Sequence, residues 1–341
     1  MKRILVVDDD LAVLKQVSAY LADDYEVSLA KSGNLALQVC VREKPDLILL
    51  DIEITDMDSF DIMSQLRRNP YLDRIPVILL AARHSAEVEI RALEAGARDF
   101  IVKPVEKSIL LHRIELHLRF ISYQAQTEQT VMNLSDSIAA SFAEMIECRD
   151  ENTSGHVIRT SKYVDILGKE MISQDLFPDE LNPAELQMMV RAAPLHDIGK
   201  IAISDRILLK AGQLDDTEFS IIKRHSEIGA IILNRMYQRM PSQHYLRYAS
   251  LIAGSHHERY DGKGYPQGLA GDLIPLCGRI MAVADVYDAL MENRVYRNSL
   301  GHIQASNIIF DNAGTHFDPR IVEIFRKTEE QITEIVNAHQ I

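Results

Sequence analysis

The chain contains no tryptophan, few cysteines and no long apolar run. The three cysteines, Cys40, Cys148 and Cys277, lie far apart in the sequence, so they predict neither a disulfide framework nor a thiolate metal site. The longest stretch without a charged residue runs only from Asn298 to Phe310, and such a stretch is too short to span a bilayer. Near the N-terminus, an acidic triplet cuts short any signal-peptide hydrophobic region. We therefore expect a cytoplasmic protein.

Positive charge is also scarce, because 37 lysines and arginines face 50 acidic residues and the net charge is −13. Binding to duplex DNA requires clustered positive charge, so we expect no duplex DNA partner. A few local cations can still hold a small anionic ligand. Histidine is plentiful by contrast, and nine of the 12 histidines lie beyond residue 120. The length of 341 residues predicts at least two domains, and the histidines direct attention to the second.

The first 120 residues alternate short apolar runs with segments of helical periodicity. The apolar runs are Ile4–Val7, Val27–Ala30, Leu47–Leu50, Val77–Ala81 and Phe100–Val102, and the helical segments are near 11–22, 34–43, 60–68, 86–95 and 107–119. Continuous apolar strands separated by helices are typical of a five-stranded parallel sheet covered on both faces. In this doubly wound α/β architecture the functional crevice lies beyond the carboxyl ends of the strands.

Acidic residues follow the strands at that crevice. Asp8 and Asp9 end the first strand and Asp51 ends the third, while Lys103 follows the fifth. Three converging carboxylates repel one another unless they hold a hard divalent cation, and Mg²⁺ suits such a site. The lysine supplies a second positive charge for an incoming phosphoryl group.

This segment resembles the receiver domain of two-component response regulators over nearly its full length. The resemblance implies that a sensor histidine kinase is the phospho-donor and that Asp51 is the phospho-acceptor. It also implies a Mg²⁺ site and a switch pair. The Mg²⁺ site would consist of Asp8 (through water), Asp9, Asp51 and the backbone carbonyl of Glu53, and the switch residues would be Lys103 and Phe100.

The segment departs from the receiver pattern at three positions. Ala81 stands where the family usually has the Thr or Ser whose hydroxyl follows the phosphoryl group. Thr55 and Ser59 stand where a proline and a glycine are common. Phosphorylation is therefore expected, whereas the direction of the response, activation or inhibition, stays open.

A connector at residues 121–147 follows this domain. No glycine or proline occurs from Val105 to Ser154, which favours helix. Two apolar stripes with helical spacing occupy the region. The first stripe is Leu110, Ile114, Leu118 and Ile121, and the second is Val131, Leu134, Ile138, Phe142 and Met145. One long helix between the domains and two ordinary core helices are both compatible with this pattern, and a continuous helix could also pair with a second subunit in a homodimer.

The remainder, residues 148–341, reads as an all-helical domain with a glycine-rich loop at residues 261–268. Two adjacent pairs, His196-Asp197 and His256-His257, lie in apolar helical surroundings, where uncompensated polar groups are costly. A metal centre would use their lone pairs. The candidate ligands are His156, His196, Asp197, His225, His256, His257 and Asp285. This set exceeds the needs of one ion, so two ions that share a bridging carboxylate fit best, and imidazole favours Fe, Mn or Ni over Mg.

The two strings His196-Asp197-Ile198-Gly199-Lys200 and His256-His257-Glu258-Arg259-Tyr260-Asp261-Gly262-Lys263-Gly264-Tyr265-Pro266 resemble the HD-GYP subgroup of the HD phosphohydrolases. The resemblance spans residues from about 144 to 327. It implies metal-dependent hydrolysis of cyclic di-GMP to pGpG, GMP or both. It also assigns the ligands to two metals: His156, His196, Asp197 and Asp285 to one, and Asp197, His225, His256 and His257 to the other.

The same resemblance implies that Asp197 and Lys200 act in catalysis and that Lys200, Arg294 and Arg297 bind the substrate phosphates. Some family members carry a glutamate four residues before the first histidine, where it supports a third metal. Here that position is Asn152, so we expect two metals. The glycine-rich loop is expected to shape the pocket rim, and a diguanylate-cyclase-type protein is an expected partner.

Three functions stay open at this point. The leading one is a cyclic di-GMP phosphodiesterase controlled by phosphorylation. The second keeps the fold and the metals but acts on another cyclic dinucleotide or nucleotide, because metal ligands say little about the base. The third is a dinucleotide-binding or scaffold protein without turnover, which the presence of all seven candidate ligands disfavours.

Overall fold

The computed structural model describes residues 1–69, 71–83, 86–150, 155–210, 212–291 and 300–338. The chain divides into two compact units, Met1–Val131 and Met132–Ile341. Each unit has its own buried apolar core, and each is described by itself below.

The first unit contains a five-stranded sheet, as the sequence predicts. The strands are β1 Arg3–Val7, β2 Glu26–Ala30, β3 Leu47–Asp51, β4 Val77–Ala81 and β5 Asp99–Val102. They pair in the order β2-β1-β3-β4-β5, and every pair is parallel. The strands β3 and β4 are buried at every position, which explains why their sequences are continuous rather than alternating. The predicted doubly wound fold is confirmed.

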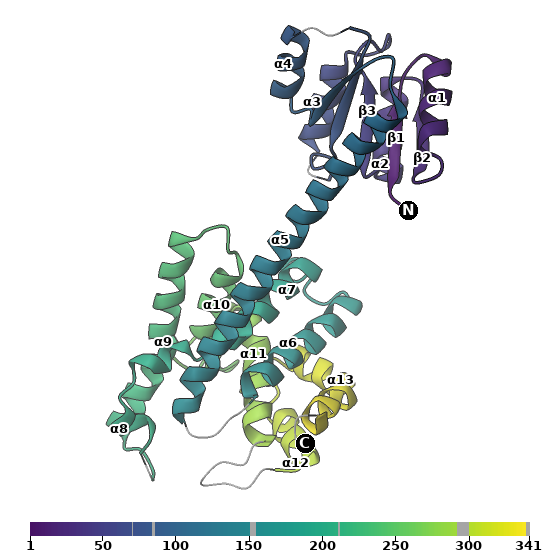
Figure 1. Cartoon of the computed structure of the whole chain (residues 1–341). Helices are drawn as coiled ribbons and strands as arrows, with labels where there is room; N and C mark the ends of the chain where they lie inside the picture. Colours follow the sequence, from purple (N-terminus) through teal and green to yellow (C-terminus); the bar gives the residue numbers. More distant parts are fainter. Residues whose placement is uncertain (70, 84–85, 151–154, 211, 292–299, 339–341) are drawn as a thin grey trace. The chain divides into compact units, whose positions relative to one another are not determined.

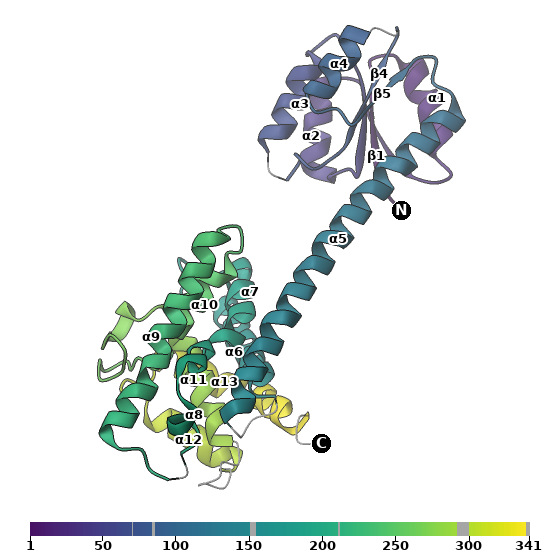
Figure 2. The ribbon, with the colours of Figure 1, turned by 60° about the vertical axis from the view of Figure 1, so that its left-hand side comes forward.

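Helices cover both faces of the sheet (Figures 1 and 2). They are α1 Leu11–Leu21, α2 Gly33–Glu43, α3 Ser59–Arg68, α4 Ala86–Glu94 and the first part of α5, which spans Lys107–Glu147. One core cluster joins the sheet to α2, α3 and α4, and a second joins its other face to α1 and α5. The carboxyl ends of β1, β3 and β5 therefore meet at one edge, which leaves their terminal residues side by side.

The connector region is one continuous helix, α5, rather than two. The two apolar stripes behave differently along it. Leu110 and Ile114 of the first stripe are fully buried in the core of the first unit. All five members of the second stripe are exposed, with Val131 at 61% and Phe142 at 54%. The side of α5 that packs on the second unit carries a small residue instead, Ala143, which is 4% exposed.

The second unit is helical. Its helices are the last part of α5, α6 His156–Ser173, α7 Pro183–Ala192, α8 Asp205–Leu208, α9 Asp216–Arg239, α10 Tyr245–Ala253, α11 Leu276–Met291, α12 His302–Asp311 and α13 Pro319–Ala338, with the 3₁₀ turns η1 Cys148–Asp150, η2 Ala193–Leu195, η3 Ile198–Ala202 and η4 Gly271–Leu273. Within its described residues, β structure is limited to isolated bridges such as Asp261 with Ala270. The predicted all-helical class is confirmed.

A close approach between η3 and α9 positions the site. A Cβ atom on Gly199 would lie 1.9 Å from the carbonyl oxygen of His225 and 2.6 Å from the amide nitrogen of Gly229. Only glycine allows the backbones to meet at this distance, and the contact brings Asp197, just before η3, next to His225 of α9.

Among the described residues, no helix combines the length and the apolar character that crossing a membrane requires.

Candidate metal centre and phospho-acceptor site

The strand ends of the first unit form an acidic group around one lysine. Asp8, Asp9 and Asp51 each place a carboxylate oxygen within 4.8 Å of the others. The Nζ atom of Lys103 lies 2.6 Å from Asp8 Oδ2 and 2.9 Å from Asp51 Oδ1. Burial alone would lower the pKa of Lys103, but these two carboxylates raise it, so the lysine stays charged.

Asp51 is buried at 4% exposure, and this burial raises the pKa of its carboxyl group, an effect that Lys103 partly offsets. The hydroxyl of Ser59 donates a hydrogen bond of 2.6 Å to the backbone carbonyl of Asp51. Ser59 therefore has a structural role, because its hydroxyl satisfies the buried backbone carbonyl of Asp51, the candidate phospho-acceptor. The backbone amide of Thr55 donates to Asp9 Oδ2 at 3.3 Å, so the loop after Asp51 closes over Asp9.

The remaining receiver residues lie around this group. The Glu53 side chain is exposed and its amide donates to the Asp51 carboxylate. Phe100 is 6% exposed and packs in the core between the sheet and α2 to α4. Ala81, at the end of β4, is also buried, and it offers no hydroxyl to the crevice.

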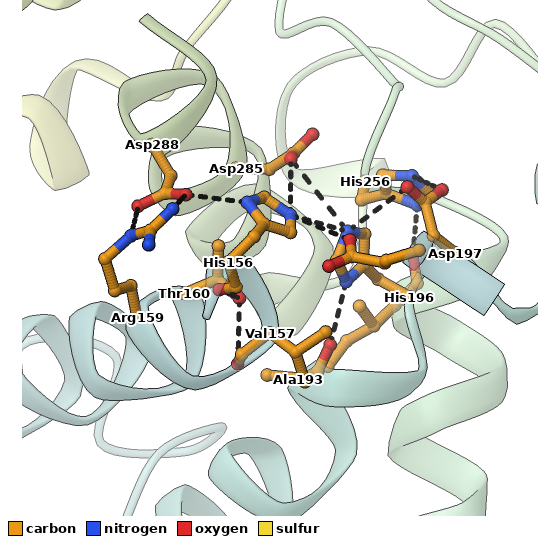
Figure 3. A network of polar contacts seen from close by, with 12 residues as sticks. His156, Val157, Arg159, Thr160, Ala193, His196, Asp197, His256, Asp285 and Asp288 are labelled. Atoms are coloured by element: carbon orange, nitrogen blue, oxygen red, sulfur yellow. Dashed lines mark hydrogen bonds and ion pairs between the residues drawn. The ribbon is translucent and has the colours of Figure 1, made fainter. Parts of the chain in front are cut away.

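The second unit gathers its candidate ligands from five segments. His156 begins α6, His196 and Asp197 lie between η2 and η3, His225 is on α9, His256 and His257 follow α10, and Asp285 is on α11. Figure 3 shows His156, His196, Asp197, His256 and Asp285 pointing toward one another. Two groups of potential metal-binding residues result: Asp197, His225, His256 and His257 in one, and Glu147, His156 and His196 in the other.

Backbone and carboxylate partners set the orientation of four imidazoles. The Nδ1 atom of His196 lies 3.0 Å from the carbonyl of Ala193, and those of His225 and His256 lie 2.6 and 3.0 Å from the carbonyls of Ile222 and Ile252. The Nδ1 atom of His156 lies 2.7 Å from Asp288 Oδ2. Because these partners are acceptors, Nδ1 of each ring carries a proton and donates it, and each Nε2 atom faces the site.

Two of these Nε2 atoms face the carboxylate of Asp197 at distances that suit ligands of a common cation. His225 Nε2 lies 3.1 Å from Asp197 Oδ1, and His256 Nε2 lies 3.6 Å from the same oxygen. Asp197 Oδ1 and His256 Nε2 are buried and have no hydrogen-bond partner among the described residues. Two or more acceptors that converge in a buried space repel one another unless a cation lies between them.

The pKa values of the imidazoles divide into two classes. Burial opposes the charge on His156, but its hydrogen bond to Asp288 and the nearby carboxylates of Glu147 and Asp285 raise its pKa to about 9, and Asp197 likewise raises the pKa of His256. Burial lowers the pKa of His196 to about 4 and that of His257 well below its usual range, so both imidazoles are neutral. Burial opposes the charge on Asp197 as well, but Lys200, with Nζ 3.0 Å from Asp197 Oδ2, and the neighbouring imidazoles hold the pKa of this carboxyl well below its usual range. Neutral imidazoles and an ionised carboxylate are the forms that bind metals.

The donor set therefore fits transition-metal ions. The two groups together contain five imidazoles and the carboxylates of Asp197 and Glu147. Asp197 Oδ1 and His256 Nε2 are buried without a hydrogen-bond partner within the part of the chain that the structure describes. Imidazole-rich ligation of this kind suits Fe, Mn, Ni or Zn. The acidic group of the first unit offers oxygen ligands only, which suits Mg²⁺.

Two of the predicted substrate-binding residues cannot be placed. Arg294 and Arg297 lie outside the described residues, and so does Asn152, on which the expectation of two metals rests. Lys200, the third predicted phosphate-binding residue, lies beside Asp197 as stated above.

The sequence reasoning missed three acidic residues at this site. Asp288 orients His156 and is also bound by Arg159, with Nη2 at 2.7 Å. Glu258 is buried directly after the histidine pair, and its carboxylate accepts from the amides of Gln267 and Leu269 at 2.7 and 3.0 Å. It thereby anchors the glycine-rich loop beside the site. A detectable signal existed for each: Asp288 lies one helical turn after Asp285, and Glu258 directly follows His257.

Glu147 is the third missed residue. It is the last residue of α5, it is 4% exposed, and its Oε1 atom lies 3.5 Å from His156 Nε2. Burial raises the pKa of its carboxyl group to about 7. The sequence alone gave no signal for it, because the burial of Ala143 four residues earlier, which marks the packed side of α5, is seen only in the structure.

Comparison with known proteins agrees with this geometry. Residues 140–321, more than half of the chain, match the family model described as "HD domain", and residues 4–115 match "Response regulator receiver domain". This chain belongs to the HD domain family. It combines an HD domain with a receiver domain, in the manner of the receiver–HD-GYP response regulators.

Three relatives illustrate the similarity. The HD-domain chain is 36% identical to a Vibrio cholerae protein named "Probable cyclic di-GMP phosphodiesterase", over 97% of this chain and 79% of the relative. It is 34% identical to "Cyclic di-GMP phosphodiesterase response regulator RpfG" of Xanthomonas campestris pv. campestris, over 97% and 89%. It is also 37% identical to "3'3'-cGAMP-specific phosphodiesterase 2" of Vibrio cholerae, but over only 63% of this chain and 38% of the relative.

Proposed function

We propose that this chain is a response regulator whose HD domain hydrolyses cyclic di-GMP to pGpG, GMP or both, under the control of phosphorylation at Asp51. The observation that carries the proposal is the convergence of imidazole Nε2 lone pairs on the Asp197 carboxylate, since this arrangement suits a metal-dependent phosphohydrolase. The names of the two relatives that match nearly the whole chain support the substrate.

The proposed ligands are His156, His196, Asp197, His225, His256, His257 and Asp285. Ions held there would supply Lewis-acid stabilisation of the charge that develops on the phosphoryl oxygens. Lys200 contributes a fixed positive charge next to Asp197 and would stabilise a phosphate oxygen, and Arg294 and Arg297 are proposed to hold the substrate phosphates. Asp288 keeps His156 in the tautomer that presents Nε2 to the site.

The rim of the site offers an aromatic surface. The ring of Tyr265 lies 4.8 Å from that of His257, centroid to centroid, and Lys223 Nζ lies 5.3 Å from the Tyr265 ring centre. Glu258 holds the loop that carries Tyr265. A tyrosine with a nearby cation suits a planar base attached to a phosphate, which agrees with a dinucleotide substrate.

The deciding experiment is chromatography of cyclic di-GMP incubated with anaerobically purified protein that has been loaded in turn with Mn²⁺, Fe²⁺ and Ni²⁺. We expect pGpG or GMP with the wild type and none with Asp197→Ala. Intact substrate with every metal, although bound metal is verified, would contradict the hydrolase proposal and favour the binding or scaffold role.

A second substrate calls for a parallel assay, because a relative is named as specific for 3'3'-cGAMP. Cleavage rates of cyclic di-GMP and 3'3'-cGAMP should be compared at equal concentration. A preference for 3'3'-cGAMP would keep the proposed chemistry and replace the proposed substrate.

The receiver domain implies a sensor histidine kinase as phospho-donor. Asp51 is the proposed acceptor, with Mg²⁺ held by Asp8, Asp9, Asp51 and the Glu53 carbonyl, and with Lys103 and Phe100 as the switch pair. The direction of control is left to measurement, because Ala81 lacks the hydroxyl that follows a phosphoryl group in relatives. Hydrolysis rates before and after acetyl phosphate treatment would determine its sign.

We also propose a homodimer through α5, because the exposed stripe from Val131 to Met145 is apolar along four helical turns. The stripe repeats with spacings of three and four residues, so a second copy presents a matching surface. Leu134→Glu with Ile138→Glu should lower the mass measured by light scattering from two chains to one, and a monomeric wild type would contradict the dimer. A diguanylate-cyclase-type partner stays a prediction.

A further inference from the structure

Glu147 lies in an unusual place for a carboxylate. It ends α5, whose apolar stripe from Val131 to Met145 is exposed, yet its own side chain is only 6% exposed. The charges of Asp197 and Asp285 act against its ionised form, whereas His156 and Lys200 favour it. Glu147 therefore shares one buried electrostatic environment with the proposed metal ligands Asp197, Asp285 and His156.

The distances around His156 fit a position for a cation. Its Nε2 atom lies 3.5 Å from Glu147 Oε1, 3.5 Å from Asp285 Oδ1 and 3.4 Å from His196 Nε2. The two distances to oxygen are longer than is typical of a direct N–H···O hydrogen bond. They match the separation of about 3.4 Å expected between ligands that each lie about 2.1 Å from one tetrahedral cation.

The orientation of the two imidazoles supports the same point. His156 and His196 each donate Nδ1–H outward, to Asp288 and to the Ala193 carbonyl, so both Nε2 atoms face the space that Glu147 borders. A nitrogen atom of each ring and a carboxylate oxygen of Glu147 thus converge within 4.8 Å of one another.

We infer that Glu147 is a further metal-binding residue, which forms with His156 and His196 a buried carboxylate–imidazole position for a divalent transition metal. This inference rests on the proposed metal-dependent function and adds to its ligand set a residue from another element. Such a position resembles the other group, Asp197 with His225, His256 and His257, in combining one carboxylate with imidazoles.

The test uses the full chain and the metal alone, without any dinucleotide. Metal-free wild type, Glu147→Gln and the control Glu144→Gln, a partly exposed glutamate one turn earlier on α5, are titrated with Co²⁺. Metal content is measured by mass spectrometry of the dialysed protein, and the visible absorption of bound Co²⁺ reports on its ligands. We expect Glu147→Gln to lose one ion per chain or to bind it about 10–100-fold more weakly.

Two further readouts separate a ligand from a residue with a purely structural role. The wild type should gain more thermal stability from Co²⁺ than Glu147→Gln does, although the metal-free forms melt alike or the variant melts higher, because binding stabilises only the native state. The control should behave as the wild type. Unchanged ion content, affinity and Co²⁺ absorption in Glu147→Gln would overturn the inference. A wild type that binds no Co²⁺ at all would instead contradict the proposed function itself.

Discussion

The two acidic sites of this protein are built from the same elements in opposite ways. Each sets carboxylates beside one lysine, Lys103 in the receiver and Lys200 in the HD domain. In the receiver, all the candidate ligands are oxygens, and Asp9 is exposed to solvent. In the HD domain, most candidate ligands are imidazoles, and His196 and His256 are completely or almost completely buried.

This difference shows how donor type and burial select the cation. Mg²⁺ keeps several of its waters, so a half-open site of oxygens suits it and permits exchange with solvent. Imidazole in a closed site suits transition metals, which then stay bound. A half-open site of this kind would let a phosphoryl group come and go, whereas a closed one would retain the proposed metals through many turnovers.

The largest expected effect is the loss of phosphorylation in the receiver with no change in the transition-metal content of the HD domain. Asp51→Asn should abolish the mass increase that acetyl phosphate with Mg²⁺ produces in the wild type, because an amide cannot form the acyl phosphate. Intact-protein mass spectrometry measures this gain, and metal analysis of the same samples should show an unchanged transition-metal content. A phosphoryl group on the variant would assign the acceptor to another residue.

Metal exchange tests whether the two sites require different cations. After chelator treatment, Mg²⁺ alone should restore phosphorylation at Asp51 but leave dinucleotide hydrolysis reduced by on the order of 10³-fold or more. Adding Mn²⁺, Fe²⁺ or Ni²⁺ should restore hydrolysis. Recovery of full hydrolysis with Mg²⁺ alone would break the distinction between the two sites.

Residues behind the ligands should matter more in the HD domain than in the receiver. Asp288→Asn removes the charge that orients His156 and should weaken transition-metal binding about 10–100-fold in a competition titration. The receiver counterpart, Ser59→Ala, deletes one hydrogen bond to the Asp51 carbonyl and should cost only about 1 kcal/mol of unfolding free energy. Equal metal affinity in Asp288→Asn and the wild type would refute the orienting role.

The smallest effect concerns acid sensitivity. Burial lowers the pKa of His316 to about 4, below the value of about 6.5 for an unfolded histidine. The unfolded state therefore binds the proton first, so stability is complete above pH 6.5 and falls as the pH drops toward 4. Between pH 7 and pH 5 the unfolding free energy of His316→Gln should therefore fall by about 1 kcal/mol less than that of the wild type, a value that allows for solvent screening. Urea melts at both pH values measure this difference, and an identical pH dependence in the variant would contradict it.

The receiver could be predicted from sequence almost residue by residue, and the reason is local. Parallel strands buried on both faces produce continuous apolar runs such as Leu47–Leu50, and the topology alone brings their ends together. Asp8 and Asp51 therefore meet because of the fold class. No detail of side-chain packing was needed to expect it.

The connector could be predicted only in part. Its helical nature followed from the absence of glycine and proline, but two apolar stripes did not tell which side packs. The structure packs the small Ala143 against the second unit and leaves Leu134 and Phe142 exposed. Small residues permit a close approach between helices. A stripe of apolar residues with helical spacing predicts that some partner covers it, but it does not identify the partner.

The sequence by itself predicted a metal centre in the HD domain, because histidines and aspartates in adjacent pairs, such as His196 with Asp197, are costly in apolar surroundings unless they bind a cation. Tertiary structure alone decided which remote residues complete it. Asp288 reaches His156 from α11 and Glu147 reaches it from α5, because helices that are distant in the chain pack around one space. From the sequence, the position at which to expect an extra carboxylate was 152, four residues before His156, and this position holds an asparagine. The fold instead brings the carboxylate of Glu147 from the end of α5. Local spacing cannot reveal such a neighbour, since packing, rather than chain connectivity, sets its distance.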